Sequence, residues 1–374
     1  MTQKNKHLWD GRKILISVGP GGVGKTTASA ALGLAAARQG KNTLVMTVDP
    51  SRRLANSLGL RDLPNVAHQI PNQELLEHGL DVKAPFSAMI PNVKRIFDDL
   101  VQRSNLSIER QQEIIDNPIY QRFSSTLAGS LEYAAVEKLY EIYTSNRYDL
   151  IILDTPPAQN AVDFLEAPQR IVEFLSNESL QWLIKPYVKS APVSRKLLSF
   201  GSSLINKTLG KMAGAETMGA LADFIVGFQG MYEGFVERSR AVQKLLMDEE
   251  TAFVVVSSDQ RQQQQSALHF YKDLRKQGFH IAGFIGNRML SPEPALDNAP
   301  LLEDFTKNLN GIESSEIRNE ILQALKFKIA LHKKAEGSIK YLRQQVGQNQ
   351  LLILPEIQNQ SPGLGSLVQL QSRL

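Results

Sequence analysis

The chain has 374 residues, of which 42% are hydrophobic, and this is ample for a large buried core. It contains no cysteine, which excludes disulfide bonds, thiol catalysis and zinc sites built on thiolates. The formal net charge of +4 at pH 7 is too small to indicate nucleic acid binding by itself.

The first ten residues have no apolar core, so we expect no secretory signal peptide. No stretch approaches about 18 uninterrupted apolar residues, so we expect no membrane-spanning helix. The lack of cysteine suits a reducing compartment, and we therefore expect a cytoplasmic protein.

The first predicted elements surround a glycine-rich loop. Residues 14–18, Ile-Leu-Ile-Ser-Val, predict a buried strand, and the alanine-rich residues 27–37 predict a helix. Between them, residues 19–26 read Gly-Pro-Gly-Gly-Val-Gly-Lys-Thr and match the P-loop pattern G-x-x-x-x-G-K-[ST]. Such a loop points backbone N–H groups at phosphate, and the helix N-terminus adds partial positive charge. The segment predicts a nucleoside triphosphate site.

The loop residues have distinct predicted roles. Lys25 should contact the β- and γ-phosphates as a point charge, the Thr26 hydroxyl should ligate Mg²⁺, and Thr27 should reach the α-phosphate. The predicted backbone cradle comprises Gly21, Gly22, Val23 and Gly24.

Further apolar runs predict the rest of a sheet. They span residues 42–49, 148–154, 251–258, 280–287 and 351–355. Their alternation with helical stretches predicts an α/β fold of the P-loop NTPase type, with a mostly parallel sheet flanked by helices. Nucleotide then binds at the carboxyl ends of the strands.

Two of these runs end in a carboxylate. Asp154 ends the run 148–154, and a carboxylate at such a strand end holds the Mg²⁺ shell in P-loop proteins. The alternative is that Asp154 is an ordinary aspartate at the end of a strand. Asp49 closes residues 42–49 and is placed to orient the attacking water. An N-cap for the following helix is the alternative role for Asp49. We favour the functional role for both.

Two long stretches, residues 85–147 and 160–247, are mostly helical in pattern. Within the first, residues 129–140 space their apolar side chains for one helix face. We interpret both stretches as one inserted α-helical subdomain. The expected nucleotide-binding core comprises residues 1–84, 148–159 and 248–374.

Three motifs together resemble the arsenite-pump ATPase family. They are Gly-x-Gly-Gly-Val-Gly-Lys-Thr-Thr at 19–27, Val-Asp-Pro-Ser-Arg-Arg-Leu at 48–54 and Leu-Asp-Thr-Pro-Pro at 153–157. That family includes the tail-anchored-protein targeting ATPase and bacterial anion-transporting ATPases, and it belongs to the deviant Walker A class. The resemblance extends over nearly the whole chain.

The resemblance implies ATP as the nucleotide, with Asp49 in switch I and Asp154 opening switch II. It also implies adenine recognition by Asn287 and by the loop at Pro355 and Glu356. From the residues alone, Asn287 ends a strand and has an amide suited to adenine, while an asparagine of an ordinary turn is the alternative. Arsenite pumps carry two ATPase halves in one chain and this chain has one, so the resemblance implies a two-fold dimer.

The chain departs from the family pattern in its loop. The family loop begins Gly-Lys-Gly-Gly, and its lysine reaches the phosphates of the partner subunit, but here the position is Pro20. We expect either Arg52 or Arg53 to supply the cation, or a paralogue with an intact loop to supply it in a mixed dimer. Without cysteine, neither the metalloid site of the pumps nor the zinc clasp of the targeting ATPase can form.

Two segments of the helical subdomain bear on partners. Residues 185–211 carry lysines and arginines without an acidic residue, which is typical of a solvated face or of a surface for anionic lipid or an acidic partner. Residues 210–235 interleave glycine with methionine and phenylalanine. Close helix packing is the favoured interpretation, and a pliable groove for an apolar client helix is the alternative. We expect no nucleic acid partner.

The sequence thus predicts a Mg²⁺-dependent ATPase that acts as a dimeric switch and hydrolyses slowly when alone. The alternative is a regulatory or scaffolding switch that binds ATP with little hydrolysis. A small-molecule kinase is disfavoured because no separate acceptor-substrate motif is found.

Overall fold

A computed structural model describes residues 7–47, 53–60, 63–126, 130–155, 232–292, 299–309, 314–357, 363–371 and 373–374, with the isolated residues 173, 220, 223, 224, 227 and 296. Asp49 and Arg52 of the predicted site lie outside the described residues, as does the basic segment 185–211. Most of the glycine- and methionine-rich segment 210–235 lies outside them too.

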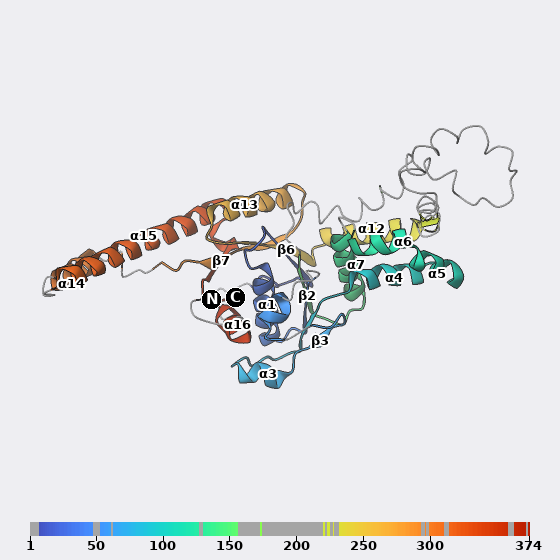
Figure 1. Ribbon diagram of the computed structural model, residues 1–374, viewed down its shortest axis with the longest axis horizontal. Coiled ribbons are helices and arrows are strands. Elements are labelled where there is room, and N and C mark those ends of the chain that lie inside the picture. The colour runs from blue at the N-terminus through green and yellow to red at the C-terminus, as the bar shows by residue number, and fades with distance from the viewer. Residues whose placement is uncertain are drawn as a thin grey trace, which may run out of the picture.

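Among the described residues, the centre of the fold is an eight-stranded sheet with the order β3-β4-β2-β5-β1-β6-β7-β8 (Figure 1). Neighbouring strands are parallel except β3 and β4, which run antiparallel. The mostly parallel sheet expected from the sequence is therefore confirmed. The strands are β1 (Ile14–Val18), β2 (Thr43–Thr47), β3 (His68–Gln69), β4 (Phe86–Met89), β5 (Leu150–Asp154), β6 (Thr251–Ser257), β7 (Ile281–Met289) and β8 (Leu351–Pro355).

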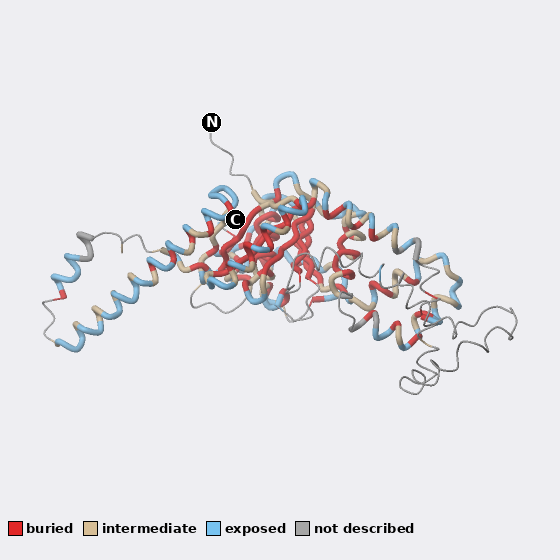
Figure 2. The backbone as a smooth tube through the Cα atoms, turned by 90° about the horizontal axis from the view of Figure 1, so that it is seen from above, coloured by how far each residue is buried: buried red, intermediate tan, exposed pale blue. Residues whose placement is uncertain are grey.

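The central strands are buried throughout. Every residue of β1, β2, β5 and β6 is buried, as expected for parallel strands with helices on both faces. Figure 2 shows the buried residues concentrated in this part of the chain. The core therefore lies directly behind the strand ends that carry the predicted site.

Helices cover both faces of the sheet (Figure 1). The helices whose apolar residues join the core on one face are α1 (Lys25–Arg38), α2 (Arg53–Ser57), α3 (Asn72–Glu77) and α16 (Leu364–Gln371). Those on the other face are α7 (Ser130–Thr144), α12 (Tyr232–Met247), α13 (Arg261–Lys276) and the end of α15 (Ser315–Val346). A Cβ atom on Gly33 would lie 2.5 Å from Val45 and 2.8 Å from Phe86, so this glycine lets α1 pack directly on the sheet.

Two strands were not anticipated from the sequence, namely β3 and β4. Strand β4 falls within residues 85–147, for which we expected a helical pattern, and the helices of that stretch begin with α4 at Val93. The reason is length, because a strand of four residues such as β4 is too short to show a periodicity.

Five helices pack together beside the sheet (Figure 1). They are α4 (Val93–Gln102), α5 (Ile108–Asp116), α6 (Pro118–Thr126), α7 and α12. The last of these comes from the second helical stretch, and the side chain of Asn117 donates a 2.8 Å hydrogen bond to the carbonyl of Ala220 in that stretch. The described parts of both stretches therefore lie together, and their grouping into one inserted subdomain stays a prediction.

Helix α15 has 32 residues and extends well beyond the sheet, with α14 (Ala299–Leu309) near its far end (Figures 1 and 2). Its last turns return to the core through Ile339, Leu342 and Val346, and the 3₁₀ turn η2 (Gln348–Gln350) leads into β8. No helix in the described part of the chain is long and apolar enough to cross a bilayer.

Candidate nucleotide-binding site

The glycine loop joins β1 to α1 at the carboxyl edge of the sheet. Gly24 is the N-cap of α1 and has φ 84°, in the left-handed region that favours glycine. A Cβ atom at Gly24 would also collide with the side-chain amide of Asn287. Both constraints explain why the loop ends in glycine immediately before Lys25.

Lys25 is held over this loop. Lys25 is only 7% exposed. Its ammonium donates hydrogen bonds to the carbonyls of Gly19 at 2.9 Å and Pro20 at 3.2 Å. The positive charge is thereby kept at the mouth of the loop, where the backbone N–H groups of the α1 N-terminus also gather.

A hydroxyl and a carboxylate meet beside Lys25. Thr26 Oγ1 donates a 2.6 Å hydrogen bond to Asp154 Oδ2, and Thr47 Oγ1 donates a 3.0 Å hydrogen bond to the same oxygen. Thr47 and Asp154 are register partners across β2 and β5, which explains their contact. Asp154 is 1% exposed. Hydroxyl and carboxylate oxygens are hard donors, and this donor set fits Mg²⁺.

A cavity of about 420 Å³ opens at this point. Among the described residues, its lining includes three cationic side chains, from Lys25, Arg53 and Arg288, and no carboxylate. This balance of charge favours a polyanion such as a polyphosphate. The described residues that line it are Gly22, Gly24, Lys25, Thr26, Thr27, Arg53, Asn56, Ser57, Thr155 and Arg288.

An adjoining cavity of about 290 Å³ brings Asn287, Pro355 and Glu356 together. These are the residues for which the resemblance implied adenine recognition. The amide nitrogen of Asn287 donates a 2.8 Å hydrogen bond to the carbonyl of Val23, so it also ties β7 to the loop. The two cavities share Thr27, Ser57 and Arg288 in their linings, and they therefore lie side by side.

Several lining residues were not identified from the sequence. Thr155 directly follows Asp154, the last residue of β5, and Arg288 directly follows Asn287 within β7, so adjacency to a predicted site residue was the available signal. Asn56 and Ser57 come from α2, whose position over the loop no local pattern reveals. Gln263 on α13 donates a 3.1 Å hydrogen bond to the carbonyl of Gly21, across 242 positions of the chain.

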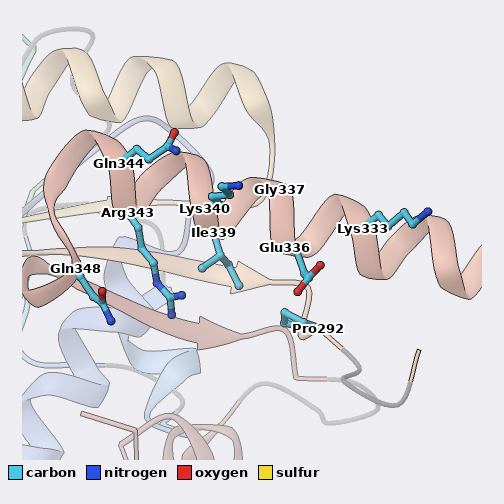
Figure 3. Close-up of a pocket in the computed structure, with 9 residues that line it drawn as sticks. All are labelled: Pro292, Lys333, Glu336, Gly337, Ile339, Lys340, Arg343, Gln344 and Gln348. Carbon is cyan, nitrogen blue, oxygen red and sulfur yellow. The ribbon is translucent and has the colours of Figure 1, made fainter. Parts of the chain in front are cut away.

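A larger cavity, of about 680 Å³, lies beneath α15 and away from the loop (Figure 3). Figure 3 shows Glu336 and Arg343 pointing from α15 toward the strands. Its charged lining residues are exposed and come from one helix, so size alone does not make it the reaction site. The described residues contain no group of three or more His, Asp or Glu side chains arranged to hold a metal ion.

Comparison with known proteins agrees with this geometry. A family model described as "Anion-transporting ATPase" matches residues 12–344. An uncharacterized protein of Streptomyces coelicolor is 30% identical over 186 residues, which cover 50% of this chain and 43% of that protein.

Two further relatives are named as ATPases. "ATPase ASNA1 homolog 1" of Paramecium tetraurelia is 29% identical over 152 residues, covering 40% of this chain and 42% of the relative. "ATPase get3" of Schizosaccharomyces japonicus is 26% identical over 164 residues, covering 43% and 45%. The matched segments thus span less than half the length of each of these relatives.

Proposed function

The chain belongs to the anion-transporting ATPase family, and on that premise we propose that it is a Mg²⁺-dependent ATPase acting as a nucleotide-driven switch. The observation that carries the proposal is the 2.6 Å hydrogen bond between Thr26 Oγ1 and Asp154 Oδ2, because Thr26 lines the same cavity as Lys25. It joins two candidate metal ligands at the end of a cationic phosphate cavity.

The proposed roles follow from this arrangement. Lys25 and the loop N–H groups bind the β- and γ-phosphates, and Thr26 and Asp154 hold the Mg²⁺ shell. Mg²⁺ neutralises charge on the phosphate oxygens when it is bound. We propose that Asp49 orients the attacking water and that Asn287, Pro355 and Glu356 hold adenine. The Asn287 amide nitrogen is bonded to the loop, and its oxygen still has the capacity to accept a hydrogen bond from an amine.

The missing loop lysine requires a substitute. Arg53 lines the phosphate cavity, which supports an arginine of the same chain as the source of positive charge beside Pro20. The alternative is a mixed dimer in which a paralogous P-loop ATPase supplies the cation. Either assembly, homodimer or heterodimer, would couple nucleotide turnover to movement between subunits.

The output of the switch is proposed to lie in the helical subdomain beside the sheet. Its client would be an apolar helix or a membrane-associated protein in the cytoplasm, as the composition of residues 210–235 and 185–211 suggested. Because no thiolate is present, arsenite and antimonite should leave turnover unchanged.

Phosphate release by the purified chain tests the proposal. We expect hydrolysis of ATP with Mg²⁺ and none with EDTA, together with micromolar or tighter ATP binding in titration calorimetry. If the chain binds ATP but does not hydrolyse it, even when other P-loop proteins from the same organism are added to the assay, the scaffolding alternative is favoured. No binding of any nucleoside triphosphate would overturn the proposal.

A further inference from the structure

Arg288 occupies an unfavourable backbone conformation within strand β7. Its φ is 52°, in the left-handed region, where glycine or asparagine is ordinarily found. The pairing register between β7 and β8 shifts between Gly286 and Met289, so Arg288 lies in an irregularity of the sheet. Irregularities of this kind redirect side chains and are frequent beside active sites.

The redirected side chain reaches the nucleotide cavities. Arg288 lines both the phosphate cavity and the cavity that contains Asn287. A Cβ atom placed on Gly24 would lie 3.7 Å from Arg288 Nε, so the guanidinium begins beside the last glycine of the loop. The residue therefore stands at the junction of the two cavities.

Among the described residues, no hydrogen-bond partner accounts for the position of this arginine. Within the described part of the chain, neither a carboxylate nor a carbonyl accepts a hydrogen bond from its guanidinium, and the residue is exposed. The left-handed conformation is costly for a residue with a side chain. An arginine that served only solubility would destabilise the protein less at a position with an ordinary φ. The conformation is thus consistent with a requirement for the guanidinium at this place.

We infer that Arg288 binds the α-phosphate of the nucleotide, an inference that rests on the proposed function. Adenine in the Asn287 cavity and β- and γ-phosphates at Lys25 leave the α-phosphate at the junction that Arg288 lines. The planar guanidinium can donate two parallel hydrogen bonds to phosphate oxygens. The contact would be made equally with ATP and ADP, so it would hold the nucleotide without distinguishing the two.

The test compares Arg288→Gln and Arg288→Gly with the parent chain. Dissociation constants for a non-hydrolysable ATP analogue and for ADP are measured by titration calorimetry. We expect each variant to lose about tenfold or more in affinity, by the same factor for both ligands. Because glycine favours the left-handed conformation, Arg288→Gly should unfold at a temperature no lower than the parent.

The matched control is Arg343→Gln, which removes an exposed arginine on α15 outside both nucleotide cavities and should leave both constants unchanged. Affinities of the Arg288 variants within twofold of the parent would overturn the inference alone. A loss confined to the ATP analogue would overturn the assignment to the α-phosphate. Failure of the parent itself to bind either ligand would overturn the proposed function, and the inference with it.

Discussion

The hydroxyl of Thr26 and the carboxylate of Asp154 are joined by a 2.6 Å hydrogen bond, although 128 positions separate them in the chain. Thr26 stands in the first turn of α1, and Asp154 is the last residue of β5. The parallel pairing of β1 with β5 brings these two ends to one edge of the sheet. The Asp154 carboxylate is therefore hydrogen-bonded to Thr26, the last residue of the P-loop motif.

Replacement of that carboxylate should weaken the response to Mg²⁺. Asp154→Asn keeps the size of the side chain but removes its negative charge, and we expect a 10- to 100-fold rise in the Mg²⁺ concentration needed for half-maximal turnover. Phosphate release measured across a Mg²⁺ titration checks this. Asp81→Asn, at an exposed position outside both cavities, is the control. An unchanged Mg²⁺ titration would leave Asp154 as an ordinary strand-end aspartate.

Lys25→Ala should remove most of the affinity for ATP. The loss of a charged phosphate contact costs about 1.5–3 kcal/mol, or roughly 10- to 150-fold in the dissociation constant. Titration calorimetry measures the loss, with Lys276→Ala on the exposed end of α13 as the control. Since Lys25 also bonds to Gly19 and Pro20, thermal unfolding should be recorded in parallel. Parent-like affinity in a folded variant would exclude this site.

Asp49→Asn separates binding from turnover. The substitution should leave ATP affinity near that of the parent and lower the single-turnover rate strongly, because Asp49 is proposed to act only on the attacking water. Rapid-mixing measurement of phosphate release gives the rate, and calorimetry gives the affinity. Hydrolysis at the parent rate, accompanied by a lower unfolding temperature, would assign Asp49 as a helix cap.

Arg53→Ala tests what replaces the absent lysine. The isolated chain should hydrolyse slowly, and the substitution should slow it further, by up to about 10³-fold if Arg53 stabilises the transition state. The reciprocal variant, Pro20→Lys, should raise the rate in the Arg53→Ala background. Fast turnover that is insensitive to Arg53→Ala and to Arg52→Ala would refute an arginine substitute. Stimulation only by a second P-loop protein would identify a mixed dimer.

An ion pair joins Arg238 on α12 to Glu137 on α7. The Glu137 side chain is 2% exposed and the Arg238 side chain 30%, so removal of Arg238 leaves a buried carboxylate that keeps the hydrogen bond from the Tyr133 hydroxyl, 3.3 Å away, but loses its positive partner. Arg238→Leu should lower the free energy of unfolding by about 3 kcal/mol. The double variant with Glu137→Leu should lose less, since it buries no unpaired charge. Urea denaturation checks both, and an additive loss in the double variant would contradict the pairing.

Local sequence determined the parts of this protein that are built from consecutive residues. Residues 14–37 specify strand, loop and helix in order, and the left-handed φ of Gly24 and the hydrogen bonds of Lys25 to Gly19 and Pro20 lie within that segment. The other predicted strands are apolar runs long enough to be recognised, and Asp154 is conspicuous because it ends one of them. Fold class, nucleotide loop and candidate metal ligand were therefore accessible before any tertiary contact was known.

Tertiary structure alone decided which distant segments meet. The short strand β4 joins the sheet by pairing in parallel with β2. The four residues of β4 do not predict this pairing by themselves. The extent of α15 beyond the sheet, and the convergence of Arg53, Thr155 and Arg288 on one cavity, likewise follow from long-range packing. The left-handed φ of Arg288 coincides with the register shift between β7 and β8, a strand that begins some sixty positions later in the chain. Such features arise because the core brings distant segments together, and the periodicity of a single segment does not predict them.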